Sequence, residues 1–431
     1  MEAIFGIGSM AMDSSGQTCE QWDFRPGCTR ARAVELREGL RMKAIIIGAG
    51  IAGLVAARQL GLAGWQVLVL ERSKEPRPEG YLMDFFGPGL RAAERIGLYP
   101  YLTEVAYRVQ AAEYVDAKGR RTASLDYQKF SDLAGGRVLT LLRPDMEGAA
   151  RKALQDVAPG RVSIRYGAWV ERIETTDARV QVQLAGQEHP ESGELLVGAD
   201  GIHSMVRAAV FGPEEDYLRP LGMRAAAFIV EEPQLNREFK NRLVLSDTVN
   251  RTAGIYGLRS TEVAAFLVYR QPEDATPSDP RQRLRKAFAG VDGRVDRLLR
   301  LCPEHPYDDA VAQVVMPGWH RGPVVLLGDA AAAVSLLAGQ GGSMAIAGAA
   351  ALGEALAAVT EPARLPNALA GYERAMRPVI ATAQASGRRA ANTFLPKNKL
   401  QLLVRRWIVR ATHLPVADRL VAKQILKRIA T

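Results

Sequence analysis

Short apolar runs alternate with a helical pattern in the first strongly periodic part of the chain. The run Ala44 to Ile47 ends at a glycine and is followed by a helix with Leu54, Ala57 and Leu60 at core spacing. A second strand, Gln66 to Leu70, comes next. This strand–helix–strand order predicts a βαβ unit and therefore an α/β fold with a parallel sheet.

A different pattern occupies the middle of the chain, where strand-like runs follow one another without intervening helices. The predicted strands are Arg224 to Val230, Arg242 to Ser246, Thr252 to Leu258 and Glu262 to Tyr269. A hairpin from Glu113 to Leu125, turning at Lys118-Gly119, is expected to join them. These runs predict an antiparallel sheet, inserted into the α/β domain, whose inward side chains line an apolar pocket.

An uncharged stretch of 24 residues, Ala330 to Gly353, follows the last apolar strand pattern. It is long enough to cross a membrane, but Gly339 to Ser343 form a Gly-Gln-Gly-Gly-Ser cluster that continues a helix poorly. We predict instead a buried strand from Pro323 to Leu327, a turn at Gly328-Asp329, a loop, and a small-residue helix beginning near Gly342.

The C-terminal segment, residues 378–431, is predicted to be helical and is strongly basic. From residue 392 on it holds nine Lys or Arg and one acidic residue. Apolar residues recur at helical spacing from Leu400 to Ala411, with Arg405, Arg406 and Arg410 elsewhere on the helix. The stripe predicts a helix that folds back onto the protein and leaves its arginines in water. A peripheral contact with an anionic membrane is the alternative.

Composition narrows the possible classes of protein. The chain has 431 residues, of which 48% are hydrophobic and 24% charged, as is ordinary for a globular protein of about two domains. The net charge of +9 lies almost wholly in the C-terminal segment, so we expect no nucleic-acid-binding face on the main body. Three cysteines without paired or zinc-type spacing argue against disulfides and a metal site, and fit a reducing cytoplasm. Residues 1–41 lack the apolar core of a signal peptide, and we expect a disordered extension.

The first turn carries the pattern Gly48-x-Gly50-x-x-Gly53, and Glu71 ends the following strand. The first glycine permits a tight turn, the second lets the backbone approach a pyrophosphate, and the third allows the helix to pack closely on the strand. Unpaired N–H groups at the helix start can bind phosphates, and a carboxylate at Glu71 can bind an adenosine ribose. This spacing predicts a dinucleotide site.

Three further segments follow the glycine pattern in a fixed order: Arg143-Pro144-Asp145, Asp200-Gly201 with Ser204 and Arg207, and Gly328-Asp329. With these motifs, over about residues 43–375, the chain resembles the class A flavoprotein monooxygenases, the family of para-hydroxybenzoate hydroxylase and the tetracycline-inactivating monooxygenases. The resemblance implies a Rossmann-type FAD-binding domain with an inserted substrate domain. The expected pieces are 42–112, 136–216 and 306–377 for the FAD domain, 113–135 and 217–305 for the substrate domain, and 378–431 for the tail.

The resemblance also implies a set of cofactor residues. They are Gly48, Gly50, Ala52, Gly53, Glu71, Arg72, Asp84, Arg143, Asp200, Asp329, Gly339, Gly341, Gly342 and Ser343. Asp329 is expected at the ribityl chain of FAD, and Arg143 and Glu71 on the adenosine side. The loop and helix start at Gly341 and Gly342 are expected to face the N1–C2=O edge of the flavin, where a helix N-terminus stabilises negative charge. His203 is expected to be structural.

The function implied by the resemblance is an FAD-dependent monooxygenase, driven by NADPH or NADH, that hydroxylates a hydrophobic aromatic or polycyclic molecule. Molecular oxygen would react through a flavin C4a-hydroperoxide, so no catalytic side chain is assigned. Phe228, Tyr256 and Phe266 are the candidate substrate contacts. The family's usual His and Pro after the Gly-Asp motif are replaced here by Ala332 and Leu336. That departure keeps open a reductase or oxidase without oxygen insertion. The other alternative is a non-enzymatic flavoprotein module at a membrane surface.

Overall fold

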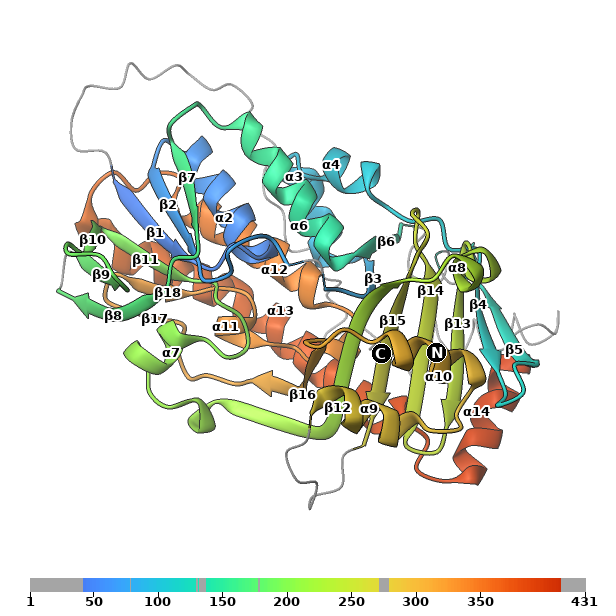
Figure 1. Cartoon of the computed structure of the whole chain (residues 1–431). Helices are drawn as coiled ribbons and strands as arrows, with labels where there is room; N and C mark the ends of the chain where they lie inside the picture. The colour runs from blue at the N-terminus through green and yellow to red at the C-terminus, as the bar shows by residue number, and fades with distance from the viewer. Residues whose placement is uncertain are drawn as a thin grey trace, which may run out of the picture.

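The computed structural model describes residues 42–77, 79–128, 131, 137–176, 179–270 and 279–411. The expectation for residues 1–41 therefore lies outside the described part of the chain. Two sheets organise the molecule and lie side by side, with the long helix α13 running beneath both of them (Figure 1). Among the described residues no helix is long and apolar enough to cross a membrane, including the helix formed by the uncharged stretch.

A six-stranded sheet forms the α/β part of the molecule. Its strand order is β17 (His320–Arg321), β18 (Val324–Leu326), β11 (Leu195–Gly198), β1 (Lys43–Ile47), β2 (Gln66–Glu71) and β7 (Val162–Tyr166). All neighbours pair in parallel except β17 with β18. The sequence-predicted βαβ unit is confirmed, because β1 and β2 flank the helix α2 (Ile51–Leu62).

Helices and small sheets complete this part of the molecule. The helices are α3 (Pro88–Arg95), α4 (Tyr99–Glu104), α6 (Arg143–Lys152), α7 (Met205–Val210), α11 (Asp329–Ala332), α12 (Gly341–Leu356) and α13 (Leu365–Phe394), with 3₁₀ turns at Ala153–Asp156, Glu214–Asp216, Leu336–Ala338 and Pro362–Arg364. The small sheets consist of β8 (Val170–Thr175), β9 (Val180–Leu184) and β10 (Glu191–Gly193), and of β3 (Leu82–Phe85) with β6 (Leu139–Leu142).

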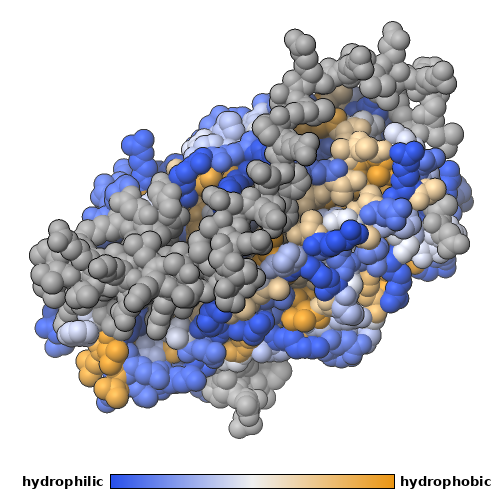
Figure 2. All heavy atoms as spheres, turned by 180° about the vertical axis from the view of Figure 1, so that it is seen from behind, coloured by the Kyte–Doolittle hydropathy of each residue, from blue (hydrophilic) through white to orange (hydrophobic). Residues whose placement is uncertain are grey.

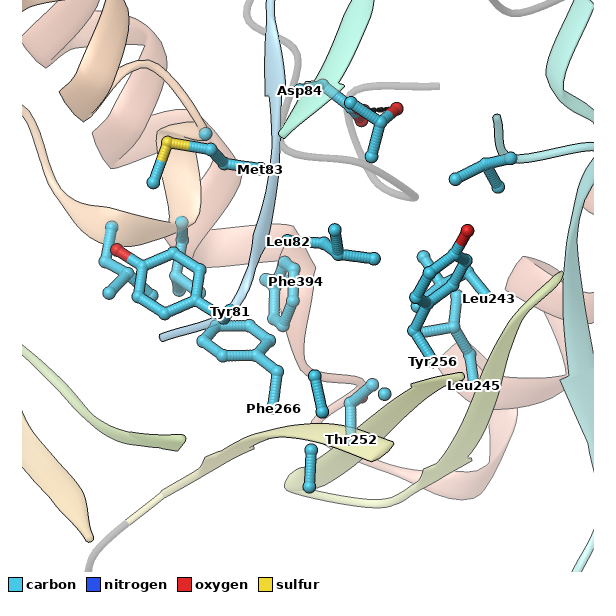
Figure 3. Close-up of a pocket in the computed structure, with 18 of the residues that line it drawn as sticks. Tyr81, Leu82, Met83, Asp84, Leu243, Leu245, Thr252, Tyr256, Phe266 and Phe394 are labelled. Atoms are coloured by element: carbon cyan, nitrogen blue, oxygen red, sulfur yellow. Dashed lines mark hydrogen bonds between the residues drawn. The ribbon is translucent and has the colours of Figure 1, made fainter. Parts of the chain in front are cut away.

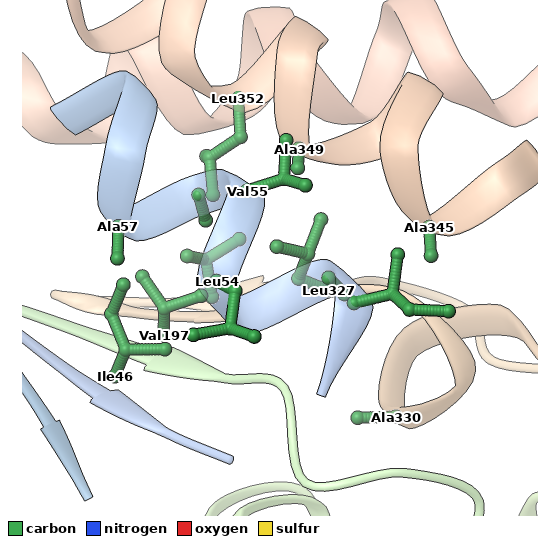
Figure 4. Packing of buried hydrophobic residues seen from close by; sticks show 14 of the residues in the cluster. Ile46, Leu54, Val55, Ala57, Val197, Leu327, Ala330, Ala345, Ala349 and Leu352 are labelled. Carbon is green, nitrogen blue, oxygen red and sulfur yellow. The ribbon is translucent and has the colours of Figure 1, made fainter. Parts of the chain in front are cut away.

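Helix α2 is buried between the sheet and α12, and small residues make this packing possible. A Cβ atom on Gly53 would lie 2.0 Å from the carbonyl oxygen of Gly48, and one on Gly353 would lie 2.5 Å from Cβ of Gln59. Only glycine permits both approaches. Figure 4 shows the resulting layers, with Leu54 and other α2 residues between apolar side chains of the strands and of α12. The small-residue helix predicted to begin near Gly342 is thus confirmed as α12, which begins at Gly341 and is mostly buried.

The second large sheet has seven strands. Their order is β16 (Tyr307–Val314), β12 (Leu218–Glu231), β15 (Glu262–Tyr269), β14 (Arg251–Gly257), β13 (Arg242–Thr248), β4 (Ala111–Val115) and β5 (Arg121–Asp126). The helices α8 (Pro233–Phe239), α9 (Pro280–Phe288) and α10 (Gly293–Leu301) belong to the same region, and α9 and α10 cover one face (Figure 1).

Two sequence expectations about this sheet are corrected. The sheet is not wholly antiparallel, because β4 pairs with β13 in parallel; the two strands are distant in the chain, so no tight turn forces them to run oppositely. The predicted boundary at residue 306 is also misplaced. Strand β16 pairs with β12 and so belongs to the seven-stranded sheet rather than to the FAD domain.

The C-terminal segment differs from its prediction in two ways. Helix α13 continues through Pro378, so no new segment begins there. The next helix, α14 (Lys399–Ala411), does lie on the body of the protein, but with the opposite face inward. Arg405 is 5% exposed, whereas Leu403 and Trp407 are 62% and 70% exposed. The expectation of a buried apolar stripe with arginines in water is therefore wrong.

The inward face of α14 is explained by a buried carboxylate on β13. Asp247 is 1% exposed, and its Oδ1 atom accepts a hydrogen bond of 3.0 Å from Nη2 of Arg406. Nε of Arg405 lies 3.9 Å from Oδ2 of the same side chain. Turning the apolar stripe inward would leave this carboxylate buried without a cation, which costs more than exposing a few apolar side chains.

This arrangement predicts a large loss of stability for one substitution and almost none for another. Asp247→Ala should lower the free energy of unfolding by roughly 3–5 kcal/mol, because it leaves two guanidinium groups without their carboxylate. Leu403→Ser should change it by less than about 0.5 kcal/mol, because Leu403 is already exposed. Chemical denaturation of the full chain measures both values. A large loss for Leu403→Ser would show that the stripe is buried after all.

Candidate active site

The glycine turn opens a cavity at the carboxyl ends of the parallel strands. Gly48 has φ of +106°, and a Cβ atom there would lie 2.4 Å from the carbonyl oxygen of Ala199, so only glycine fits. Gly50 and Ala52 line the cavity at the start of α2, where backbone N–H groups lack helical partners. Gly53 does not reach the cavity; it permits the close approach of α2 to β1.

Glu71 ends β2 beside this turn and is held as a carboxylate. Its Oε2 atom accepts a hydrogen bond of 2.8 Å from the Ala49 N–H, and Oε1 accepts one of 3.0 Å from the Ser73 N–H. Burial raises the pKa of Glu71, but these hydrogen bonds and Arg77 outweigh it, so the pKa is lowered overall. Glu71 lines the cavity together with the exposed Arg72.

The Asp200-Gly201 motif forms a second wall. Asp200 accepts hydrogen bonds from the hydroxyl of Ser204, at 2.6 Å, and from the N–H of Val206, at 3.1 Å, which ties it to the start of α7. Burial raises the pKa of Asp200, and these hydrogen bonds oppose the rise. Arg207 is fully buried and donates to the carbonyl oxygen of Ala330, so this motif is joined to the Gly-Asp motif.

His203 lies between two carboxylates at the edge of the same cavity. Its Nε2 atom is 2.9 Å from Asp309, and its Nδ1 atom is 3.0 Å from Glu214. The hydrogen bond to Asp309 is the largest cause of a pKa raised to about 9, with burial opposing it and Glu214 adding to it. His203 is therefore a cation at neutral pH. The expectation of a purely structural residue overlooked this charge.

Arg143 and Asp329 line the cavity from the starts of α6 and α11. Nη2 of Arg143 lies 2.7 Å from Oε1 of Glu147. Burial raises the pKa of Asp329, and the charge of Arg143 opposes that rise. Both residues line the glycine-turn cavity and the adjoining polar groove defined below.

The start of α12 completes the wall, with one correction. Gly341 and Gly342 line the cavity, and a Cβ atom on Gly342 would lie 2.9 Å from the sulfur of Met83. Gly339, in the left-handed conformation with φ of +64°, lines the neighbouring cavities. Ser343 is 2% exposed and its hydroxyl donates to the carbonyl oxygen of Phe86, so it braces this segment and does not line a cavity.

A second cavity, here called the substrate cavity, lies between this wall and the seven-stranded sheet (Figure 3). Tyr256 and Phe266 line it. Phe228 does not: it is fully buried in the core on the face covered by α9 and α10. It pairs with Ala265, whereas Phe266 pairs with Ala227, and successive strand residues point to opposite faces. Phe228 is therefore withdrawn as a substrate contact.

Asp84 is the acidic residue among those lining the substrate cavity. Its Oδ1 atom accepts hydrogen bonds from the hydroxyls of Thr140, at 2.8 Å, and of Tyr127. Burial raises the pKa of Asp84, and both hydrogen bonds oppose the rise. The sequence expectation placed Asp84 beside the flavin, and the structure places it at the strand β3 that separates the two cavities.

A third cavity, here called the polar groove, adjoins the first two. Its wall includes the cations Arg72, Arg77, Arg143 and His203 and also carboxylates, among them Asp200, Asp308, Asp309 and Asp329. Tyr81 and Met83 line all three cavities, which makes β3 and its approach the partition between them. Sequence reasoning missed Tyr81, Met83, Arg77 and Arg405. Tyr81 and Met83 are close to Asp84 in the sequence, so the segment that suggested Asp84 could also have identified them.

The two departures from the family pattern have different positions. Ala332 is buried in α11 and lines none of the three cavities. Leu336 lines both the substrate cavity and the polar groove. It follows Ser335, a non-glycine residue with φ of +87° whose hydroxyl accepts a hydrogen bond from the Leu337 N–H. Leu336 is thus the departure that contacts the site.

A long cleft lined by a glycine turn, a ribose-type carboxylate and a helix N-terminus is the architecture of an FAD-dependent oxidoreductase of the class A monooxygenase type. The comparisons agree. A profile of the FAD binding domain family matches residues 41–386. An uncharacterized protein of Mycobacterium tuberculosis is 33% identical over 72% of this chain and 83% of its own length. A flavin-dependent monooxygenase from an unknown prokaryotic organism is 28% identical over 83% and 91%.

Solved structures give the same result. The crystal structure of tetracycline destructase Tet(55) has a TM-score of 0.71 and 26% identity, covering 86% of this chain and 95% of that one. The chain therefore belongs to the FAD binding domain family, and it is an oxidoreductase of the FAD-dependent monooxygenase group. The alternative of a non-enzymatic module is contradicted by this assignment.

Gly50 lines the cavity at the start of α2, and a substitution there tests whether FAD binds at this turn. A Cβ atom on Gly50 would meet only Oε1 of Glu147, at 3.5 Å, so the protein itself has room for a side chain. Gly50→Val should therefore fold but lose FAD, with affinity reduced roughly 100-fold or more, because the valine occupies the path of the pyrophosphate. Flavin absorbance after gel filtration measures the loss.

The matched control is Gly53→Val. Its side chain would strike the Gly48 carbonyl, so it should lower stability and not only FAD content. A stable, fully yellow Gly50→Val protein would contradict the assignment of the turn to the pyrophosphate.

Proposed function

We propose that the protein is an FAD-dependent monooxygenase, driven by NADPH or NADH, that hydroxylates a hydrophobic aromatic or polycyclic molecule. One observation supports this proposal above all. Tyr81 and Met83 line both the substrate cavity and the cleft of the FAD domain, so the two adjoin each other. An aromatic ring in the substrate cavity would lie against the flavin end of that cleft. The relatives support this proposal, since they include flavin-dependent monooxygenases and a tetracycline destructase, which acts on a polycyclic compound.

FAD would be held along the whole cleft. The N–H groups at Gly50 and Ala52 would bind the pyrophosphate, Glu71 and Arg143 the adenosine side, and Asp329 the ribityl chain. These residues all line one cavity. When bound and reduced, FAD would supply the electrons that activate molecular oxygen. The side chains of this protein would position the substrate and exclude water.

The lining of the substrate cavity suits that task. Leu243, Leu245, Tyr256 and Phe266 make most of one side apolar, which favours a hydrophobic ring and keeps water out. Asp84 offers an acceptor within this lining, already held by Tyr127 and Thr140. A substrate hydroxyl or N–H group would donate to it, which would fix the orientation of the ring.

The nicotinamide donor would dock in the polar groove. Its lining holds the guanidinium groups of Arg72 and Arg77, which would bind the phosphates of the donor, together with several carboxylates. The groove also adjoins Asp329 and Gly341, so a donor there would lie next to FAD. The groups do not distinguish NADPH from NADH.

A turnover screen tests the proposed function. Aromatic and polycyclic compounds are added to the FAD-loaded enzyme with NADPH or NADH, and nucleotide consumption, peroxide and products are measured together. We expect some compounds to accelerate consumption at least roughly tenfold, as substrate-positioning steps of this size are common, with a product one oxygen atom heavier. Peroxide formed in equal amount to the nucleotide consumed, without product, would instead identify an oxidase.

A second proposal concerns a membrane surface, and the exposed stripe on α14 favours it. Leu400, Leu403, Val404 and Trp407 are between 48% and 70% exposed. Figure 2 shows a group of hydrophobic spheres at its lower left, the end of the molecule where α14 lies. We propose that this stripe contacts an anionic lipid surface, since the surrounding C-terminal segment is strongly basic.

Vesicle flotation tests this contact. The intact protein should float with phosphatidylserine vesicles at low salt and much less at high salt, because screening weakens the basic contribution. Trp407→Ser should reduce flotation roughly tenfold while retaining FAD, because it removes the largest exposed apolar side chain. Equal flotation of the two proteins, or none by either, would refute the membrane contact.

A further inference from the structure

The segment between α11 and α12 contains a strained residue at the place where the cavities meet. This segment, residues 333–340, is here called the α11–α12 loop. It lines the substrate cavity and the polar groove, and it leads into Gly341 and Gly342 of the glycine-turn cavity. Within it, Ser335 has φ of +87° and ψ of 134°, a conformation that glycine adopts readily and other residues only under constraint. Its surroundings must therefore hold it in this form.

Two buried glutamines, here called the glutamine clamp, hold the loop immediately before this serine. Gln313 of β16 is 1% exposed, and Gln384 of α13 is 8% exposed. The side-chain amide of Gln313 donates a hydrogen bond of 3.0 Å to the carbonyl oxygen of Val334. The amide of Gln384 donates one of 3.2 Å to the carbonyl oxygen of Ala333 and one of 2.7 Å to that of Val314. Gln313 also donates 2.8 Å to the backbone carbonyl oxygen of Gln384, so the two residues act together.

Helix α13 comes close enough to the loop for these contacts only because residue 387 is glycine. A Cβ atom on Gly387 would lie 2.3 Å from the carbonyl oxygen of Val334. The next residue, Arg388, fixes the orientation of the clamp, since its Nη1 atom donates 3.0 Å to Oε1 of Gln313 and so leaves Nε2 facing the loop. All of these contacts converge on the backbone just before Ser335.

Ordinary core packing is the alternative explanation for two buried glutamines. Asn236 is a buried amide of that ordinary kind. It is 6% exposed, and its Nδ2 atom donates to the carbonyl oxygens of Leu258, at 2.9 Å, and Glu262, at 2.6 Å. It joins α8 to the turn between β14 and β15 and lines none of the three cavities. The glutamine clamp differs, because it constrains a strained loop that borders the cavities. Strain that the surroundings maintain is concentrated at functional sites.

We propose that Gln313 and Gln384 are positioning residues for the flavin that keep the strained α11–α12 loop against the flavin end of the cleft. This inference rests on the proposed placement of FAD along the cleft. The loop fixes where α12 begins, and the N-terminus of α12 favours negative charge, which reduced flavin carries. A loop released from the clamp therefore weakens the binding of reduced FAD more than the binding of oxidised FAD.

The test compares the binding of oxidised and reduced FAD to the full-length protein. Titration of the apoprotein gives the dissociation constant of oxidised FAD, and the reduction potential of the bound flavin gives the ratio of the two constants. Gln384→Leu removes both amide hydrogen bonds at similar side-chain volume. It should weaken reduced FAD roughly tenfold more than oxidised FAD, which lowers the two-electron potential by about 30 mV. No substrate or nicotinamide donor is used, so a failure of the proposed oxygenation reaction leaves the result unaffected.

The Ser335→Gly background shows whether strain is what the clamp opposes. Glycine adopts this φ without strain, so the loop keeps its form without the clamp. The effect of Gln384→Leu on the ratio of the two constants should therefore fall from roughly tenfold to about twofold in the Ser335→Gly background. A glutamine that merely filled the core would, when replaced, lower the melting temperature equally in both backgrounds and leave the flavin potential unchanged.

Two further variants separate positioning from stability. Asn236→Leu is the matched control, because it also removes a buried amide that donates two hydrogen bonds to backbone carbonyls. It should lower the melting temperature without changing the flavin potential. Gly387→Ala keeps both glutamines but pushes its Cβ atom against the Val334 carbonyl, and alanine is well tolerated in a helix. It should lower the flavin potential as Gln384→Leu does.

Three results would overturn the proposal. They are a wild-type flavin potential in a folded Gln384→Leu protein, an equal fall in potential in Asn236→Leu, and an effect of Gln384→Leu that is undiminished in the Ser335→Gly background. If Gln384→Leu does not fold, Gly387→Ala decides in the same two backgrounds, since it leaves every hydrogen-bonding group of the clamp in place.

Discussion

The close approach of α2 to β1 is the constraint on which the remaining architecture depends. A single Cβ atom on Gly53 would collide with the Gly48 carbonyl at 2.0 Å, so the helix can begin against the strand only because both positions are glycine. That contact aims the N-terminus of α2 into the cleft. It also lets α12 pack over α2 through small residues, and this brings Gly341 and Gly342 to the opposite wall. The cofactor cleft is therefore a consequence of backbone packing rather than of side-chain chemistry.

The second element on which the architecture depends is β3, because it borders both the cleft of the FAD domain and the cavity at the seven-stranded sheet. Its approach contributes Tyr81 to every cavity, while Asp84 accepts hydrogen bonds from residues of two other segments. The seven-stranded sheet turns alternate side chains toward β3 and toward α9 and α10. One face is therefore a cavity wall and the other an ordinary core. The face of the sheet that lines the substrate cavity thus differs from the other face mainly in its neighbours. Strand β3 lies over the first, and α9 and α10 lie over the second.

The sequence predicted the features that are local. The glycine turn, the strands around it, the sheet strands and the small-residue helix all follow from periodicity and turn chemistry within short windows. Phe228 was misassigned because both faces of its strand are apolar, so alternation alone cannot tell core from cavity. The orientation of α14 depends on Asp247, which lies far away in the chain. Its apolar stripe was therefore a misleading signal, because a buried carboxylate outweighed it.

The inner and outer faces of helix α14 have different surroundings, so substitutions on the two faces test different properties of the protein. Arg405 points inward, is 5% exposed and lines the substrate cavity with Phe394 of α13. Trp407 points outward and is 70% exposed. A change to Trp407 on the outer face therefore alters no residue that lines the cavity. The C-terminal part of the chain is thus a wall of the substrate cavity whether or not it meets a lipid surface, and removing it would open that cavity to water.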